Sequence, residues 1–223
     1  MEIEAPPSER DAPAAERSAE PAERVEGPSP EDEVERLLRA GFDEIRQQGS
    51  VEPRVADIVR RAGLSNKAFY RHFRSKDELI LAILEQGMRR RVRIFEGRLA
   101  ELPSAAERVR AWIRTVQEQA VNREYADVTR PFCVYQARLT EDLGEQLWSH
   151  TDRLRAPLEE ALEEGTRNGE FRQMDVHVEA VNIYWLAMGW MQSMVLRREV
   201  PTQAQAEAVV DFALRAVQSD GSD

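Results

Sequence analysis

One segment of the chain carries side chains that can bind base edges and phosphates of nucleic acid. Residues 51–76 hold seven basic and two acidic side chains, although the whole chain of 223 residues has a formal net charge of −10. Phe69 and Phe73 are four residues apart and share one face of a predicted helix, so the polar side chains between and before them project from the other face. Lysine suits guanine, asparagine suits adenine, and tyrosine or arginine suits phosphate. The outward donors are Asn66, Lys67, Tyr70 and Arg71.

Two short helices are needed to position these donors. The first begins at Pro53 and ends at Gly63, and the second begins at Ser65. Gly63 allows the positive φ that a tight turn needs, and Leu64 anchors the corner in the core. This pattern is typical of a helix-turn-helix, whose second helix enters the major groove of DNA. A plain helical hairpin is the alternative interpretation, because short amphipathic helices joined by a glycine are common.

Capped helices flank this hairpin. Residues 29–32, Ser-Pro-Glu-Asp, are typical of a helix start, and that helix ends near Gly49. Residues 75–78, Ser-Lys-Asp-Glu, form a capping box that opens a fourth helix. Residues 29–85 are therefore predicted to form a small DNA-binding domain. We expect the basic run that follows, residues 89–93, to be a solvated helix face.

Residues 33–85 closely resemble the TetR family of bacterial repressors. The resemblance rests on four stretches: Ala56-Asp57-Ile58, Ala62-Gly63-Leu64-Ser65, Phe69-Tyr70-Arg71-His72-Phe73 and Ser75-Lys76-Asp77-Glu78-Leu79. It implies an all-α homodimer in which an N-terminal helix-turn-helix DNA-binding domain joins a larger C-terminal helical domain for effector binding and dimerisation.

The resemblance also implies a role for each matched position. Four residues are expected to face bases: Ser65, Asn66, Lys67 and Ala68. Phosphate contacts are expected from Tyr70, His72 and Lys76, although a lone histidine at a helix end more often simply packs there. Arg54 stands where the family often has a small hydroxyl residue, and Lys67 stands where it often has glycine. Both departures add positive charge. The predicted DNA-binding set is Arg54, Ser65, Asn66, Lys67, Ala68, Tyr70, Arg71, His72 and Lys76.

The negative net charge of the chain does not exclude a DNA partner, because the charge is distributed unevenly along the sequence. A net charge of −10 would repel phosphates if it were spread evenly over the surface. Residues 31–98, however, have a net charge of +3, whereas residues 1–30 have −5 and residues 99–223 have −8. The first 30 residues contain six prolines and six alanines and have little apolar content, so residues 1–28 are predicted to be a disordered acidic tail.

Residues 86–223 are predicted to form a helical effector-binding and dimerisation domain. Helical segments are expected near 104–122, 124–140, 142–168, 176–198 and 202–218, and no stretch shows the two-residue alternation of a strand. Ten of the 15 aromatic residues lie beyond residue 98, and most of them are expected in the core. We expect Pro131 to bend or interrupt its helix and open a cavity for a fairly apolar effector. The candidate lining residues are Phe132, Tyr135, Trp148, Asn182, Tyr184, Trp185 and Met188.

The segment 176–198 is apolar on nearly every side and therefore needs a partner surface. Together with residues 202–217 it predicts a four-helix bundle across the two-fold axis of a homodimer. An interaction surface for a different protein is the alternative. The uncharged run at 180–196 has 17 residues and includes polar side chains, so it is too short and too polar for a membrane span.

Catalysis finds little support in the sequence. The three histidines lack metal-ligand spacing. Cys133, the single cysteine, has no evident activating base. No Gly-rich phosphate loop and no secretory signal are found. We therefore expect a cytoplasmic protein without catalytic residues, bound metal or cofactor, whose partners are double-stranded DNA, a small-molecule effector and a second copy of itself. The alternative is a helical small-molecule-binding protein or enzyme whose helix-turn-helix has no DNA role.

Overall fold

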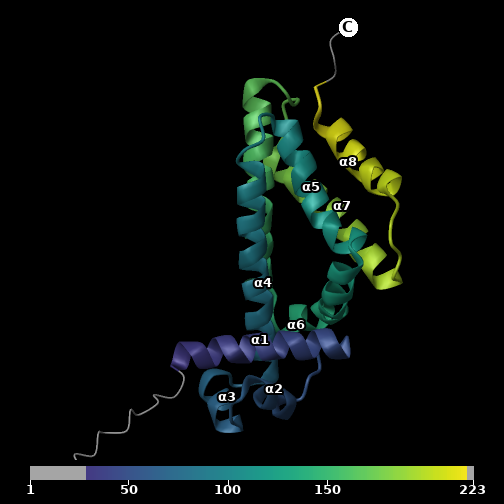
Figure 1. Cartoon of the computed structure of the whole chain (residues 1–223). Coiled ribbons are helices and arrows are strands. Elements are labelled where there is room, and N and C mark those ends of the chain that lie inside the picture. Colours follow the sequence, from purple (N-terminus) through teal and green to yellow (C-terminus); the bar gives the residue numbers. More distant parts are fainter. Residues whose placement is uncertain (1–28, 220–223) are drawn as a thin grey trace, which may run out of the picture.

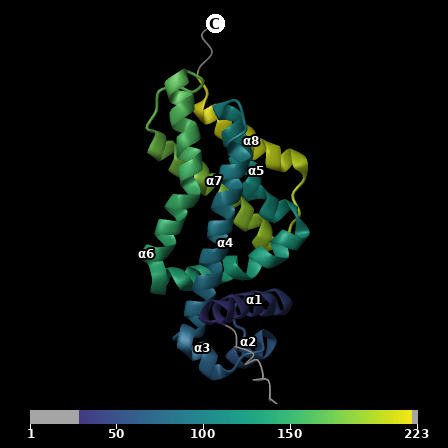
Figure 2. The same ribbon diagram turned by 60° about the vertical axis from the view of Figure 1, so that its left-hand side comes forward.

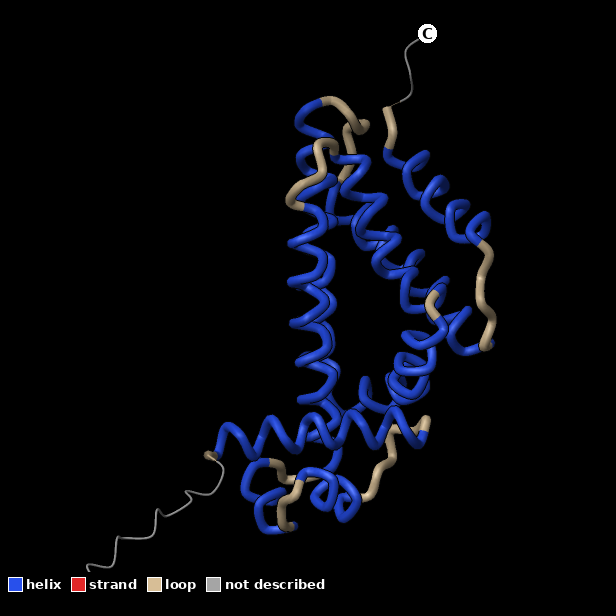
Figure 3. Tube along the Cα trace, viewed as in Figure 1, coloured by secondary structure: helices blue, strands red, loops and turns tan. Residues whose placement is uncertain are grey.

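The computed structural model describes residues 29–219, except for the side chains of residues 136–150, and this part of the chain is helical (Figure 1). The expected tail, residues 1–28, lies outside the described residues. Short loops join the helices, and no strand is present in the described part (Figure 3). The all-α prediction is confirmed. The helices are α1 (Pro30–Gln48), α2 (Val55–Ala62), α3 (Asn66–His72), α4 (Lys76–Leu99), α5 (Ala105–Val121), α6 (Arg123–Asn168), α7 (Val176–Arg197) and α8 (Gln203–Val217).

The helices α1, α2 and α3 and the first turns of α4 surround one hydrophobic core at one end of the molecule (Figure 1). Ser29 and Asp32 form a capping box at the start of α1, and Ser75 caps α4 by accepting a hydrogen bond from the Glu78 amide. Between α2 and α3, Gly63 has φ 68°, the left-handed conformation that the turn requires. Buried side chains from all four helices fill this core, including Leu37, Ile45, Ile58, Phe69, Leu79 and Ile80.

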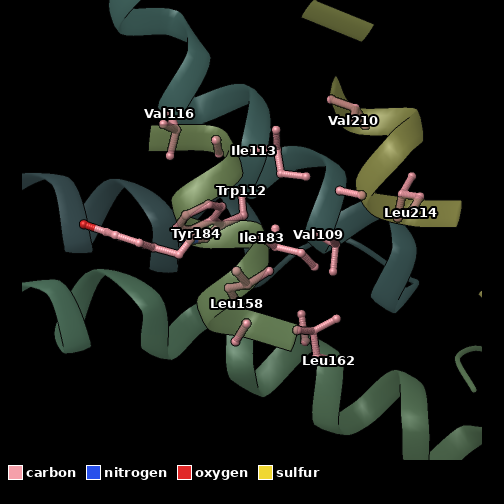
Figure 4. Packing of buried hydrophobic residues seen from close by; sticks show 14 of the residues in the cluster. Val109, Trp112, Ile113, Val116, Leu158, Leu162, Ile183, Tyr184, Val210 and Leu214 are labelled. Atoms are coloured by element: carbon pink, nitrogen blue, oxygen red, sulfur yellow. The ribbon is translucent and has the colours of Figure 1, made fainter. Parts of the chain in front are cut away.

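A second core lies among α5, α6, α7 and α8 and the C-terminal half of α4 (Figure 4). Trp112 of α5 is its central side chain. Its ring stacks on Phe95 with the ring centroids 5.4 Å apart, and its indole N–H donates a hydrogen bond of 3.0 Å to the Leu154 carbonyl. A buried indole therefore has both its apolar faces and its polar atom satisfied.

The helix α6 differs from the prediction. Segments 124–140 and 142–168 were expected to be separate, but they form one helix of 46 residues that continues through Pro131 and Pro157. The helix bends, so that its N-terminal part crosses α1 while its later part runs beside α4 (Figure 2). Gly144 alone costs a helix only about 1 kcal/mol, and packing against α4, α5 and α7 outweighs it. None of the described helices has a stretch long and apolar enough to cross a membrane.

Candidate functional site

The helix α3 presents a polar face at the outer end of the molecule (Figure 1). Asn66 and Lys67 are exposed, and the Tyr70 side chain is 61% exposed. On the opposite face Phe69 is completely buried. The Ser65 hydroxyl caps the helix by accepting a hydrogen bond of 3.2 Å from the Ala68 amide. The hydrogen-bond donors of α3 therefore point to the outside of the molecule. A single capped helix of this kind is narrow enough to enter a major groove.

A buried carboxylate of α1 holds the C-terminal end of α3. Glu33 accepts a hydrogen bond of 2.9 Å from Arg71 Nη1 and lies 2.7 Å from His72 Nε2. The hydrogen bond with His72, and secondarily the charge of Arg71, hold the pKa of Glu33 below its ordinary value, against the opposing effect of desolvation. Because Glu33 lies on α1, this cluster orients α3 relative to the rest of the domain.

Two predicted DNA contacts need correction. Ala68 is buried with only 4% of its surface exposed, because its methyl group lies on the core side of α3, so its side chain cannot face a base. His72 is also mostly buried and directs Nε2 at Glu33, so it positions the helix instead of presenting this nitrogen to a phosphate. Arg71 shares the same carboxylate but stays half-exposed. The other predicted positions remain accessible: Arg54, Ser65, Asn66, Lys67, Tyr70 and, partly, Lys76.

The role of the acidic residues of α1 was not predicted from the sequence. Glu33 and Glu44 are buried, and Glu44 accepts a hydrogen bond of 2.6 Å from Arg61 Nε on α2. A signal was present, because Glu33, Leu37 and Glu44 are spaced by four and seven residues and therefore share the core face of one helix. An acidic residue on an apolar face indicates a buried partner of opposite charge.

A cavity of about 240 Å³ lies among α1, α4, α5, α6 and α7. Three of the predicted effector-binding residues, Phe132, Tyr184 and Met188, line it. Their role in binding stays a prediction. The cavity reaches the surface beside Gly87, which is exposed and also lines it. Its wall is mostly apolar, with a few polar groups contributed by Arg91, Gln119, Thr129, Thr151, Tyr184 and Gln192.

The other predicted lining residues lie elsewhere. Tyr135 is buried in the N-terminal core and donates a hydrogen bond of 2.5 Å to Asp77 Oδ1. Asn182 and Trp185 are exposed on the outer side of α7, because the face that bears Tyr184 and Met188 is the one turned inward. Trp148 lies outside the described side chains.

Arg91 corrects the expectation that residues 89–93 are a solvated face. It lines the cavity together with Leu84, Met88 and Phe95, which precede and follow it at helical spacing on α4. The basic character of the run concealed that one of its arginines continues an apolar stripe. Arg91 follows Leu84 by seven residues and precedes Phe95 by four, and this helical spacing could have predicted its inward direction.

The cavity shares its wall with the N-terminal core. Phe42 of α1, Ile83 of α4 and Phe132 of α6 belong to that core or pack against it, and all three line the cavity. One turn beyond Phe132, Tyr135 contacts Asp77 at the start of α4, directly after α3. A molecule in the cavity therefore touches side chains that support the helix-turn-helix.

An apolar strip remains exposed on α7 and α8. Trp185 and Phe212 have 44% and 60% of their surfaces exposed, and Val178 and Leu196 lie on the same side of α7 as Trp185. Gly189 belongs to this strip, and a side chain added there would meet no other atom within 4 Å. Such a strip, with a glycine that lets a helix approach closely, is typical of a helix–helix interface.

Comparison with known proteins identifies the N-terminal domain. The sequence profile described as bacterial regulatory proteins, tetR family, matches residues 37–83, which run from α1 to α4. This part of the chain is therefore similar to the TetR family of bacterial regulatory proteins. A relative in Mycobacterium tuberculosis, the uncharacterised HTH-type transcriptional regulator Rv2912c, is 35% identical over 74 residues. Those residues are 33% of this chain and 38% of that relative, so the match spans little more than a third of the relative's length.

Solved structures of transcriptional regulators share the fold over most of the chain. FadR from Bacillus subtilis in complex with stearoyl-CoA has a TM-score of 0.68 at 19% identity, over 81% of this chain and 97% of that one. A transcriptional regulator from Saccharomonospora viridis in complex with choline has a TM-score of 0.69 at 19% identity, over 85% and 99% of the two chains. At this level of identity the likeness shows the fold alone.

The buried contact of Glu33 predicts a pH-dependent contribution to stability. A carboxyl whose pKa is lowered by folding stabilises the native state above its unfolded pKa, and this stabilisation is lost as pH falls through the folded pKa. We expect Glu33→Gln to lower the melting temperature at pH 7, and the difference from the wild type to shrink below about pH 4.

Thermal unfolding followed by circular dichroism between pH 3 and pH 8 measures this difference. Glu35→Gln is the matched control, because Glu35 is exposed on the same helix and pairs only with Arg39 among the described residues. An effect of Glu33→Gln no larger than that of Glu35→Gln would refute the assigned role of the buried carboxylate.

Proposed function

We propose that this chain is a cytoplasmic, ligand-responsive transcriptional regulator that binds palindromic operator DNA as a homodimer. In this proposal it acts as a repressor, and a small molecule in the cavity releases it from DNA. The observation that carries the proposal is the exposed donor face of α3, which is capped by Ser65 and held from behind by Glu33. The match of residues 37–83 to the tetR family of bacterial regulatory proteins supports the same conclusion.

The DNA contacts follow from the chemistry of the exposed side chains. Asn66 and Lys67 stand at the N-terminal end of α3, which is the end that reaches base edges in a helix-turn-helix. Tyr70 lies one turn later and suits a phosphate, as do Arg54 and Lys76 at the starts of α2 and α4. Two copies of α3 can bind successive major grooves when they lie about 34–36 Å apart.

The response to a ligand follows from the wall that the cavity shares with the N-terminal core. A ligand that contacts Phe42, Ile83 and Phe132 favours whichever orientation of the N-terminal domain accommodates it best. If that orientation moves the two copies of α3 out of register with successive grooves, the ligand lowers the affinity for DNA. The ligands held by two TetR-like neighbours of the same fold, stearoyl-CoA and choline, support a binding role for this domain.

The first experiment tests the DNA contacts. Genomic fragments bound by the purified protein would supply a cognate site, and Lys67→Ala should weaken binding to that site roughly 10–100-fold, as expected for loss of a base or phosphate contact. Tyr70→Phe should weaken it less, because only one hydroxyl is lost.

Fluorescence anisotropy at several salt concentrations measures both affinities and the salt slope. Arg167→Ala is the control, because Arg167 is exposed at the far end of α6. Affinity and salt slope that stay at wild-type values in Lys67→Ala and Tyr70→Phe would remove α3 from the proposed interface.

The second experiment tests the homodimer. Phe212→Glu places a charge in the apolar strip and should convert a dimer to a monomer, because burying an unpaired carboxylate in an interface costs several kcal/mol. Tyr70→Glu is a matched control, since Tyr70 is 61% exposed and Phe212 is 60% exposed, but Tyr70 lies on α3. Sedimentation velocity measures the mass. A wild-type monomer, or a Phe212→Glu variant that remains dimeric, would contradict the proposed interface.

The third experiment separates ligand response from DNA binding. A side chain added at Gly87 meets no other atom within 4 Å, so the position has room for a larger residue at the mouth of the cavity. Gly87→Leu should keep its affinity for DNA while losing release by any effector that dissociates the wild type. Gly97→Leu is the control, because Gly97 is equally open on α4 but lies outside the cavity. Unchanged release in Gly87→Leu would place the effector elsewhere.

A further inference from the structure

The most informative side chain in the cavity is Arg91. Among the described lining residues it is the one charged group, in a wall that is otherwise apolar or neutral. Arg91 is partly buried, burial lowers the pKa of its guanidinium, and it makes no hydrogen bond or ion pair within the described part of the chain. Two other arginines of α4 do have partners: Arg89 pairs with Glu85, and Arg98 pairs with Glu118.

Among the described residues, the groups near Arg91 do not supply an anion. Burial raises the pKa of Cys133 to about 11 despite the nearby guanidinium, so its thiol is protonated at neutral pH. Burial also raises the pKa of Tyr184, which keeps the phenol neutral. Glu118 is occupied by Arg98, whose Nη1 donates to it at 2.6 Å. An arginine keeps its proton in proteins, so a cation faces the cavity.

A buried cation without a partner is costly, and the cost falls when an anion binds beside it. The guanidinium fork matches a carboxylate through two parallel hydrogen bonds. The remaining wall, which includes Phe95, Trp112, Met188 and Met191, suits an apolar body. A cationic ligand is disfavoured here, because it would meet the charge of Arg91 at short range.

We propose that the cavity binds a small carboxylate with an apolar tail or ring, whose anionic head pairs with Arg91. This inference rests on the proposed function, since it names the chemical class of the effector. The volume of about 240 Å³ restricts the enclosed ligand to a compact molecule, slightly below the usual range of small-molecule sites.

The test uses three probes built on a ten-carbon chain: decanoate, decanol and decylammonium. Their small heads are an anion, a neutral hydroxyl and a cation, and isothermal titration calorimetry with the full chain, below the micellar concentrations, measures each affinity. We expect decanoate to bind on the order of 10–100-fold more tightly than decanol, and the cation to bind most weakly. No binding of decanoate, or an equal affinity for all three probes, would overturn the inference.

Arg91→Met tests the assigned partner. The variant keeps an apolar side chain of similar length, so it should weaken decanoate about 10–100-fold and leave decanol unchanged. Without ligand its melting temperature should rise, because an uncompensated buried charge has been removed. Arg93→Met is the control, because Arg93 is exposed in the same run. A preference for decanoate that survives in Arg91→Met would also overturn the inference.

These measurements are made without DNA, so the two proposals fail separately. A wild-type protein that prefers decanoate but selects no DNA fragment would refute the regulatory function and retain the carboxylate site. A protein that binds a specific DNA site but shows no preference among the three probes would refute the carboxylate site alone.

Discussion

The structure depends on α4 being one continuous helix that contributes to both hydrophobic cores. Its first turns supply Leu79 and Ile80 to the N-terminal core, and its last turns supply Phe95 and Leu99 to the second core. The cavity lies against the middle of the same helix. Because packed cores resist continuous deformation, a shift of α4 must be accompanied by a repacking at one end or the other. The cavity is thus placed where a ligand can bias the position of α3.

Two contacts connect the N-terminal domain to the helices that line the cavity. Glu33 binds α3 to α1, and Tyr135 of α6 donates to Asp77 at the point where the chain leaves the helix-turn-helix and enters α4. The first contact keeps α3 fixed relative to its own domain. The second contact connects that domain to the helix whose Phe132 lines the cavity. The three-helix unit can therefore move as a body while the geometry of α3 is preserved.

Local chemistry explains which features could be predicted from the sequence. The turn at Gly63 and the caps at Ser29 and Ser75 depend on residues within four positions, so they could be predicted. The inward direction of Arg91, the burial of Ala68 and the place of Tyr135 depend on partners far away in the chain, and here the predictions were absent or wrong. The continuity of α6 follows from tertiary packing, which overrides the local signals at Pro131 and Thr140–Gly144.

The effective charge of the helix-turn-helix also depends on partners far away in the chain. Residues 51–76 contain seven basic side chains, but three of them are neutralised by acidic partners: Arg60 by Asp57, Arg61 by Glu44 and Arg71 by Glu33. The other four cations of residues 51–76, Arg54, Lys67, Arg74 and Lys76, make no ion pair with another described residue. Two acidic residues of α1 thus neutralise charges that a count within residues 51–76 includes. The attraction for phosphate is concentrated on these four side chains, of which Arg54 and Lys76 lie at helix starts and Lys67 lies on the outer face of α3.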